Sequence, residues 1–359
     1  MKMTENKVLV AMSGGVDSSV AATLLKKQGY FVVGGFMKNF SAESWSGVVE
    51  NDCPWQKDSE DAQNVCQKLG IEFRAFNFEK EYRDKVIEYF FAEYAAGRTP
   101  NPDIMCNKEI KFGLFLDKAV QLGFDYIATG HYARIQKFKT AYRLRKGVDQ
   151  KKDQSYFLYA LNQYQLSKSL FPIGQYTKTQ VRHMAHEFGL HNADKKDSQG
   201  VCFVGHINLR EFLKQRLPER VGEIVDAAGR VIGAHPGAWY FTIGQRHGLR
   251  VGGGKPYYVA QKDISHNRLF VVNKEYHRLV YDTPVSLEKV HWINKESSLP
   301  YRCKAKIRYQ QPDQNCVVSR TDSGVVVNFE GPQFAPAPGQ SLVFYDKDIV
   351  LGGGVIEGI

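Results

Sequence analysis

The sequence predicts three parts: an α/β domain with a mostly parallel sheet, a small β-rich central domain, and a C-terminal β-barrel. Before about residue 130, short apolar runs alternate with helix-like stretches, which is typical of a parallel sheet covered by helices. After Gly205 the chain has Gly-rich β segments, and from about Val280 it has short alternating strands separated by turn residues. We therefore expect domains at residues 1–206, 207–279 and 280–359.

The first domain is expected to alternate strands with helices. Apolar runs predict strands at residues 7–12, 31–37, 73–78 and 125–133. Helical spacing predicts helices at residues 20–27, 58–69, 80–96 and 108–122. The run ARIQKFKTAYRLRKG alternates like a hairpin, and YFLYALNQYQLSKSL and TKTQVRHMAHEFGL are interpreted as two amphipathic helices. Ligands of such a sheet bind at the carboxyl ends of its strands.

The later domains are expected to be mostly β. One short helix, INLREFLKQRL, precedes the Gly-rich segments GEIVDAAGRVIGAH and RHGLRVGGGKPYYVAQKDI. The runs KAKIRY, CVVSR, GVVVNF and SLVFYD then follow at short intervals, which favours a closed or nearly closed barrel.

Composition excludes several classes of protein. A chain of 359 residues with 43% hydrophobic and 13% aromatic residues is neither a small stapled scaffold nor globally disordered. No stretch approaches the roughly 20 apolar residues that span a bilayer, and the start lacks the regions of a signal peptide. We expect a cytoplasmic protein with no membrane partner. The formal charge of +10 favours a polyanionic partner or an anionic substrate, although solubility alone would also explain it.

Six cysteines are few for this length, and none of them forms a CxxC pair. Neither a disulfide framework nor a zinc ribbon is therefore indicated, and we expect thiols. Four of them are assigned to packing, with a sulfur-handling or regulatory role also considered for Cys53: Cys53, Cys66, Cys303 and Cys316.

The sharpest local signal is the string Ser13-Gly14-Gly15-Val16-Asp17-Ser18-Ser19, between an apolar strand and a helical stretch. Glycines let the backbone approach an oxyanion, serine hydroxyls can donate, and the helix N-terminus adds free N–H groups. Asp17 could hold Mg²⁺ against phosphates. The string is not a Walker A loop, because no GxxxxGK[ST] occurs. A plain Gly-Gly turn would explain the glycines but not the whole string.

Two cysteines stand in unusual contexts. Cys106 follows Asn101-Pro102-Asp103 and precedes a helix expected to begin near Lys108. A thiol near a helix N-terminus and a lysine has a pKa below its ordinary value of about 8.5, but a packed cysteine at a helix start explains the position equally. Cys202 lies in a polar, glycine-containing approach to an apolar run, which suits a flexible sulfur carrier or a small packed hydrophobe.

The loop resembles the PP-loop (SGGxDS) of the ATP pyrophosphatase superfamily, whose members split ATP into AMP and pyrophosphate. The resemblance extends over essentially the whole chain. GRTPNPDIMCNKEIKF, ATGHYAR, KKDQSYFL, SKSLFPIG, DSQGVCFVG and FTIGQRHGL occur in the order and spacing of the bacterial tRNA-uridine 2-sulfurtransferases, or tRNA-specific 2-thiouridylases. It implies an adenine nucleotide hydrolase-like first domain.

The resemblance implies ATP and Mg²⁺ as cofactors, with Asp17 as the metal residue. Met37 and Gly130 end their strands where main-chain groups could contact adenine, although both are also ordinary strand-end residues. The implied ATP-binding residues are Ala11, Met12, Ser13, Gly14, Gly15, Val16, Asp17, Ser18, Met37 and Gly130.

The resemblance also implies a two-cysteine reaction. Cys106 matches the family's nucleophile, and Cys202 matches the cysteine that carries the persulfide. ATP converts the uridine C2 oxygen into an adenylate, so that AMP can leave. The persulfide either attacks C2 directly or is released as hydrosulfide when Cys106 attacks it. Either route leaves a Cys106–Cys202 disulfide that a reductant resets. The sequence leaves both routes open.

The implied macromolecular partner is tRNA, bound at its anticodon region, with the lysine, glutamate and glutamine acceptors as the implied substrates. A persulfide donor or a sulfur-relay protein would load Cys202. The base is expected to be flipped from its stack to reach the pocket. The implied RNA contacts are Asn101, Pro102, Asp103, His131, Lys152, Asp153, Gln154, Arg308, Tyr309 and Gln340.

Some of these positions have plain structural explanations. A lone histidine after a strand is usually structural, and the basic run KFKTAYRLRKGVDQKKD suits either a phosphate track or a solvated hairpin face. The barrel segment KAKIRY could supply a second anchor on the anticodon stem.

Two other functions compete with thiolation. One is a different ATP pyrophosphatase, such as an amidating synthetase or a lysidine-type tRNA ligase, which needs no catalytic cysteines. The other is a basic RNA-binding module in which SGGVDSS has lost its role. The two cysteine motifs favour the thiolating enzyme.

Overall fold

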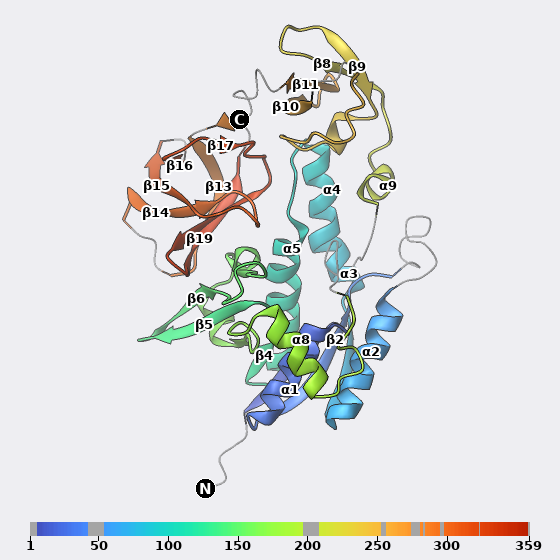
Figure 1. Ribbon diagram of the computed structural model, residues 1–359, viewed down its shortest axis with the longest axis vertical. Helices are drawn as coiled ribbons and strands as arrows, with labels where there is room; N and C mark the ends of the chain where they lie inside the picture. Colours follow the sequence, from blue (N-terminus) through green and yellow to red (C-terminus); the bar gives the residue numbers. More distant parts are fainter. Residues whose placement is uncertain are drawn as a thin grey trace.

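The computed structural model describes residues 6–41, 54–196, 208–252, 256–273, 281–282, 284–294, 298–322 and 324–357. Figure 1 shows a parallel sheet with its helices near the N-terminus, a small β-rich unit beyond helix α4, and a barrel at the C-terminal end. The expected domain boundaries at 206/207 and 279/280 fall outside the described residues and stay predictions.

The first sheet has five strands, and all of its pairings are parallel, as predicted. Its spatial order is β3-β2-β1-β4-β7. The strands are β1 (Lys7–Met12), β2 (Phe31–Lys38), β3 (Glu72–Asn77), β4 (Tyr126–Ala128) and β7 (Ser169–Leu170). Because β1 lies at the centre, the loop that follows it opens at the carboxyl edge, flanked by the ends of β2 and β4.

Helices cover both faces of this sheet. Val8, Val10 and Met12 of β1 point to one face, where they pack against three helices, whereas Leu9 and Ala11 point to the other. The helices on the first face are α1 (Val16–Lys27), α2 (Pro54–Leu69) and α8 (Lys178–Glu187). Those on the second face are α3 (Glu79–Tyr82), the π-helical turn η2 (Arg83–Ile87), α4 (Glu88–Ala95), α5 (Pro102–Met105), the π-helical η3 (Cys106–Leu114) and α6 (Phe115–Gln121).

The helix expected to begin near Lys108 begins six residues earlier, at Pro102. Asn101 caps it, because its side-chain oxygen accepts hydrogen bonds from the backbone N–H groups of Asp103 (3.2 Å) and Ile104 (3.4 Å). Pro102 fits the first helical position, where no N–H is needed. The expected start was therefore wrong, and Cys106 lies inside a helical run from 102 to 121.

A second expectation was also wrong. The run YFLYALNQYQLSKSL is not one amphipathic helix but the 3₁₀ turn η4 (Ser155–Leu158), the short α7 (Gln163–Ser167) and strand β7. Asn162 begins α7 with a capping box closed by Gln165, and β7 then pairs with β4 as the fifth strand.

The predicted hairpin is present as β5 (Ala133–Phe138) and β6 (Ala141–Lys146). It does not stand alone, because β6 pairs antiparallel with β19 (Ile349–Ile356) of the C-terminal barrel. Asp348, just before β19, accepts hydrogen bonds from Arg134 and Arg145 of the hairpin, both at 2.9 Å. The hairpin thus joins the first domain to the barrel.

The central unit begins with α9 (Leu209–Lys214) and forms a four-stranded sheet in the order β10-β11-β8-β9. Its core contains Ile224, Val259 and Leu269. Its other elements are β8 (Gly222–Val225), β9 (Val231–His235), the 3₁₀ turn η5 (Ala238–Tyr240), β10 (Tyr257–Asp263) and β11 (Arg268–Asn273).

The C-terminal barrel is confirmed as an antiparallel sheet of six strands, closed by pairing of β13 with β19. Val318, Leu342 and Phe344 fill its interior. Its strands besides β19 are β13 (Val285–Trp292), β14 (Tyr301–Lys306), β15 (Gln314–Thr321), β16 (Gly324–Phe329) and β18 (Ser341–Asp346), and β12 (Tyr281–Asp282) pairs separately with β17 (Gln333–Phe334). In the part of the chain that is described, no helix has the length and apolar character of a membrane span.

Candidate active site

The loop after β1 is folded by its own serines. The Ser18 hydroxyl donates to the Gly15 carbonyl (3.1 Å) and accepts from the Ser13 N–H (3.2 Å), and the Ser19 hydroxyl donates to the same Gly15 carbonyl (2.9 Å). Ser18 and Ser19 are almost fully buried. These hydroxyls therefore shape the turn, and the backbone N–H groups at the start of α1 are the natural donors to an anion.

Two glycines let other segments approach this loop closely. Gly14 has a φ of 72°, and a Cβ at this residue would lie 2.3 Å from the Asp58 carbonyl oxygen. A Cβ at Gly130, after β4, would lie 2.8 Å from the Asp17 carbonyl carbon and the Ser18 nitrogen. The fold thus brings Gly130, an expected nucleotide residue, directly against the loop.

The Asp17 carboxylate has two partners from elsewhere in the chain. The Lys178 ammonium group donates to both of its oxygens, at 2.8 and 2.9 Å, and the Tyr132 hydroxyl donates at 2.8 Å. The Lys178 side chain is only 12% exposed. Within the described segments, no group of three or more His, Cys, Asp or Glu side chains could hold a metal ion. The Lys178 ammonium group and the Asp17 carboxylate therefore lie next to each other beside the loop at residues 13–19.

Sequence reasoning missed Lys178 and Tyr132. Lys178 is the first residue of α8, which Thr177 and Gln180 begin with a capping box, and that motif places the lysine at a helix start. The sequence held no signal for its partner, because only the fold brings α8 to the loop.

Lys195 and Asn192 hold the back of the loop. Both donate to the Gly14 carbonyl, Asn192 at 3.0 Å and Lys195 at 3.3 Å. Lys195 also pairs with Asp58 (2.7 Å) and Asp61 (2.6 Å). Partial burial disfavours its charge, but the hydrogen bonds to these two carboxylates raise the pKa of Lys195 above its ordinary value. The segment that precedes the second cysteine motif is therefore anchored to the loop at residues 13–19.

The remaining expected nucleotide residues end neighbouring strands. In the sheet register, Ala11 pairs with Gly35 and Met12 with Phe36, so that Met37 lies at the carboxyl edge beside the loop. Val16 begins α1. These positions suit main-chain contacts with a bound nucleotide.

Asn39, two residues after Met37, was not singled out from the sequence. It is 2% exposed, and neither of its side-chain amide atoms has a hydrogen-bond partner among the residues that are described. A buried amide without partners costs about 1–3 kcal/mol. Its place beside the strand end suits a polar ligand that would satisfy it.

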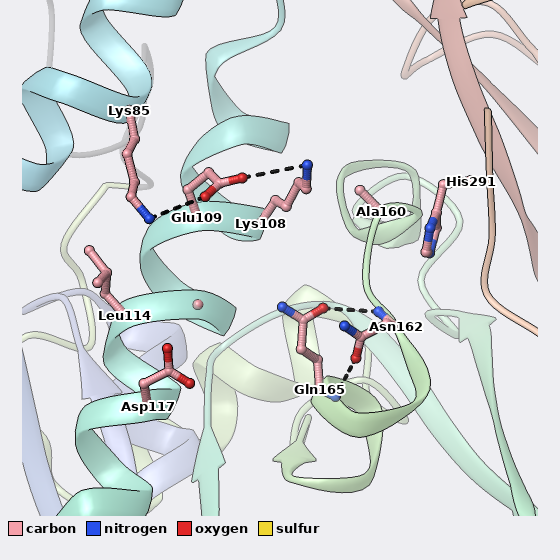
Figure 2. Close-up of a pocket in the computed structure, with 10 residues that line it drawn as sticks. Lys85, Lys108, Glu109, Leu114, Asp117, Ala160, Asn162, Gln165 and His291 are labelled. Carbon is pink, nitrogen blue, oxygen red and sulfur yellow. Dashed lines mark hydrogen bonds and ion pairs between the residues drawn. The ribbon is translucent and has the colours of Figure 1, made fainter. Parts of the chain in front are cut away.

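Cys106 is fully buried in the core on the second face of the sheet. It follows the first turn of the helical run, so that its N–H is not one of the helix-terminal donors on which the expectation relied. The Lys108 side chain is half exposed, and its Nζ lies 3.5 Å from Oε1 of Glu109. Figure 2 shows the two side chains facing each other. Cys202, and with it Cys53, falls outside the described residues.

His131 lies three residues after the end of β4 and directly after Gly130. It is buried between Phe112 and Phe171, and its Nδ1 lies 2.7 Å from the Thr129 hydroxyl. Burial, and to a smaller extent Lys111, lowers the pKa of His131 well below its ordinary value. The imidazole is therefore neutral at physiological pH.

The run Lys152-Asp153-Gln154 is tied into the same region. The buried Asp153 carboxylate accepts from the Gly147 N–H (3.0 Å) and the Ser155 N–H (3.1 Å). The Gln154 side-chain oxygen accepts from the Tyr132 N–H at 3.0 Å. Both side chains thus shape the turn before η4.

The barrel contributes Arg308 and Tyr309. The Tyr309 ring lies 4.5 Å from the Phe157 ring, and the Phe157 carbonyl accepts from the Asn107 side chain at 3.2 Å. Arg308 donates to the Ala335 carbonyl at 3.0 Å. Phe157 therefore links Tyr309 to η3, the helix that carries Cys106.

Gln340 also comes from the barrel. Its side-chain nitrogen donates to the carbonyl oxygens of Thr99 (2.9 Å) and Pro100 (3.4 Å), immediately before Asn101-Pro102-Asp103. The expected RNA residues thus come from three segments of the first domain and from the barrel.

Outside these residues, a cavity of about 370 Å³ lies between η3, the α7 region and the barrel. In Figure 2, Lys85 and Lys108 reach toward Glu109, and His291 lies near Ala160 across the cavity. Lys85 and Lys108 both pair with Glu109, and Asp117 also lies in the lining, so that two cations and two carboxylates leave this wall with little net charge.

Three family models match the chain in succession. They are described as tRNA methyl transferase HUP domain over residues 6–206, tRNA methyl transferase PRC-barrel domain over 210–273, and aminomethyltransferase beta-barrel domain over 283–356. The first alone covers more than half of the chain.

Curated relatives match over nearly the full length. The tRNA-specific 2-thiouridylase MnmA of Halalkalibacterium halodurans is 50% identical over 356 residues, 98% of this chain and 95% of the relative. The protein of the same name from Alkaliphilus oremlandii is 49% identical over 361 residues, 99% of this chain and 98% of the relative. That of Pseudomonas aeruginosa is 49% identical over 357 residues, covering 98% and 94%.

Among solved structures, a 4-thiouridine synthetase–RNA complex with bound ATP aligns with 59% of this chain and 50% of its own. The TM-score is 0.37 and the identity 17%, so this likeness carries no argument.

Proposed function

Because the chain belongs to the tRNA-specific 2-thiouridylases, we propose that it replaces the C2 oxygen of the anticodon wobble uridine with sulfur. It is a tRNA 2-thiouridylase, an enzyme of tRNA modification with an ATP-using first domain. The observation that carries the finer assignment is the loop at residues 13–19, closed by Gly130 and faced by Lys178. The family models carry the words methyl transferase, but a loop built for phosphates favours the relatives' reaction.

The first step activates the base. The uridine C2 oxygen attacks the α-phosphorus of ATP, pyrophosphate leaves, and the carbonyl becomes an adenylate. The N–H groups at the start of α1 would hold the phosphates, and Lys178 would stabilise the charge that develops on pyrophosphate. Met37, Gly130 and the Asn39 amide, which has no hydrogen-bond partner among the described residues, would surround the adenine end.

Mg²⁺ fits the donor set at Asp17. Magnesium in nucleotide sites commonly takes one or two carboxylates together with phosphate oxygens, and Asp17 offers a partly exposed carboxylate beside the loop. The ion would neutralise phosphate charge there. Lys178 and Tyr132 keep the carboxylate oriented toward the site.

The second step transfers sulfur. The terminal sulfur of a Cys202 persulfide forms the bond to C2, either directly or as hydrosulfide, and AMP leaves with the former carbonyl oxygen. The Cys106 thiolate takes the inner sulfur, so that a Cys106–Cys202 disulfide remains and a thiol reductant must restore both thiols. The burial of Cys106 supports a step that excludes water.

The RNA would lie along Asn101-Pro102-Asp103, His131 and the Lys152-Asp153-Gln154 run, with Tyr309 supplied by the barrel. A neutral, buried His131 suits contact with an uncharged base edge. The net charge of +10 supports phosphate contacts. We further propose the lysine, glutamate and glutamine tRNAs as substrates, a persulfide donor or sulfur-relay protein as the source for Cys202, and the cytoplasm as the location.

One experiment tests the whole proposal. Purified protein, with Cys202 loaded as the persulfide, is incubated with ATP, Mg²⁺ and unmodified tRNA, and the anticodon nucleosides are analysed by mass spectrometry. The expected result is 2-thiouridine at the wobble position, with one AMP and one pyrophosphate per sulfur. AMP release with a different modified nucleoside would favour another ATP pyrophosphatase, and tRNA binding without AMP release would favour a binding module.

A further inference from the structure

The connection between α4 and α5 is held from one side by the central unit. A Cβ at Gly97, whose φ is 75°, would lie 2.4 Å from Cγ1 of Ile264. The Thr99 hydroxyl donates to that of Thr242 at 3.2 Å. These contacts leave little freedom to the backbone that leads into the expected base-contacting turn.

The barrel holds the same backbone from the other side. The Thr99 N–H donates to the Pro338 carbonyl at 2.7 Å, and the Gln340 side chain donates to the carbonyls of Thr99 (2.9 Å) and Pro100 (3.4 Å). Gly339 has a φ of 88°, and a Cβ there would lie 2.9 Å from the Thr99 nitrogen. The two backbones are therefore in direct contact.

Gln340 is itself fixed within the barrel. Its N–H donates to the Ala337 carbonyl at 3.1 Å, and its carbonyl accepts from the Ile356 N–H at 2.8 Å. The Gly339 N–H donates to the Ile356 carbonyl at 2.9 Å. Since β19 anchors both residues, a movement of the barrel would move the backbone at Thr99 with it.

The backbone held in this way determines where the catalytic helix begins. Asn101, directly after Pro100, caps α5, and the helical run continues from Pro102 through Cys106. A shift at Thr99 and Pro100 would therefore displace the base-contacting turn and Cys106 together. Misplacement of reacting groups by about 1 Å can cost 100-fold in rate.

We propose that Gln340 is a positioning residue, which holds the Thr99-Pro100 backbone so that the base-contacting turn and Cys106 are placed correctly when the barrel binds RNA. The proposal deepens the thiolation function and rests on it. It differs from the expectation that Gln340 contacts tRNA, because its side-chain nitrogen donates to two protein carbonyls. The barrel then acts on the chemistry through the protein.

The two roles of Gln340 predict different kinetics. A positioning residue changes the rate at saturating tRNA and leaves the tRNA dissociation constant nearly unchanged, whereas an RNA contact changes that constant. Gln340→Met keeps the length of the side chain and removes its donor. Gln314→Met is the matched control, because Gln314 also lies in the barrel and donates to a backbone carbonyl, that of Pro312, at 3.2 Å.

The measurements are single-turnover thiolation and AMP release at saturating tRNA, together with tRNA binding at equilibrium. For Gln340→Met we expect both rates to fall at least tenfold and the dissociation constant to change less than twofold. Gln340→Lys, which restores a donor of similar reach, should recover most of the rate. Gln314→Met should match the wild type.

A wild-type rate for Gln340→Met at saturating tRNA would overturn the proposal, whether or not binding weakens. Thermal unfolding of each variant checks that the barrel is intact. Gly339→Ala, whose added Cβ would press on the Thr99 nitrogen from the same barrel side, should show the same loss of rate. If the wild type released AMP without transferring sulfur, the proposed function would fail. The positioning role would still be decided by comparing the rate of AMP release of Gln340→Met with that of the wild type.

Discussion

The Lys178 ammonium group lies 2.8 and 2.9 Å from the two carboxylate oxygens of Asp17, although the residues are 161 positions apart in the chain. The Tyr132 hydroxyl completes the arrangement at 2.8 Å from Asp17. A lysine in this position can stabilise phosphate charge, and the carboxylate keeps it aligned until a nucleotide arrives. The proposed phosphate site is thus assembled from the start of α1, the segment between β4 and β5, and the start of α8.

Removing the lysine charge should weaken ATP use. Charge-assisted hydrogen bonds contribute about 1.5–3 kcal/mol, so Lys178→Met should lower kcat/KM for ATP by about 10- to 100-fold. Pyrophosphate release at varied ATP measures the effect. Lys118→Met, on the exposed side of α6, is the control and should leave kcat/KM unchanged. Equal values for the two variants would argue against a phosphate-binding role for Lys178.

The Asp17 carboxylate should matter for chemistry and for stability. Asp17→Ala is expected to abolish nucleotide-dependent AMP formation while the fold remains intact, because the loop lies at the strand end. It leaves a largely buried Lys178 without this partner, so we also expect a loss of about 1–2 kcal/mol in unfolding free energy. AMP formation and urea unfolding measure the two effects. Near-normal turnover would contradict the ATP assignment.

The strand, loop and helix at residues 7–27 could be predicted because the apolar run, the two glycines and the following helix are continuous in sequence. The true start of the helix before Cys106 is visible in the sequence as the Asn101-Pro102 cap, but the expected start near Lys108 did not use it. Strand β7 has only two residues and carries no readable pattern.

The parts of the site that the sequence could not reveal depend on distant contacts. Lys178, Asn192 and Lys195 reach the loop only after α8 packs on α1. Likewise, the attachment of the hairpin to β19 depends on pairing between strands some 200 residues apart, as the Arg145–Asp348 hydrogen bond, 203 positions apart, illustrates. Sequence periodicity describes single elements and not their neighbours.

The two cysteines should fail at different steps. Cys202→Ser should lose the protein-bound persulfide, whereas Cys106→Ser should retain it, and neither variant should form 2-thiouridine. Persulfide-specific alkylation followed by mass spectrometry distinguishes them. Cys66→Ser is the control, because burial raises the pKa of the Cys66 thiol to about 11 and makes it a packing residue. Wild-type thiolation by both variants would exclude the two-cysteine reaction.

His131 should make the fold sensitive to acid. Because burial lowers its pKa, the unfolded chain binds a proton below about pH 6.5 that the folded state does not take up. The contribution of neutral His131 is therefore complete above that pH and declines as the pH falls. Urea unfolding at pH 7.5 and 5.5 measures the effect. Between these two pH values, His131→Gln should lose less free energy of unfolding than the wild type. His183→Gln is the control, because the His183 side chain is 74% exposed. It should lose as much free energy of unfolding between the two pH values as the wild type does.

The last prediction concerns the tip of the β5–β6 hairpin, where Phe138 is 42% exposed and the Arg143 guanidinium lies 3.6 Å from its ring centroid. Lys137 and Lys139 flank this ring in sequence, which gives an aromatic and basic surface suited to an RNA backbone. If RNA lies there, tRNA affinity must fall as salt rises, with a slope of about −0.7 to −0.9 per phosphate neutralised.

Neutralising both lysines, as Lys137→Gln with Lys139→Gln, should reduce the log–log slope by about one to two units, because each lysine would release one counterion equivalent. The matched control changes Lys57 and Lys68, two exposed lysines on α2, which Figure 1 shows on the other side of the sheet from the hairpin. Tyr309 and Arg308 are poorer probes, since both pack against protein groups and their removal would disturb the barrel. The same slope for both pairs of substitutions, or a loss of ATP affinity in place of tRNA affinity, would reject the hairpin as an RNA contact.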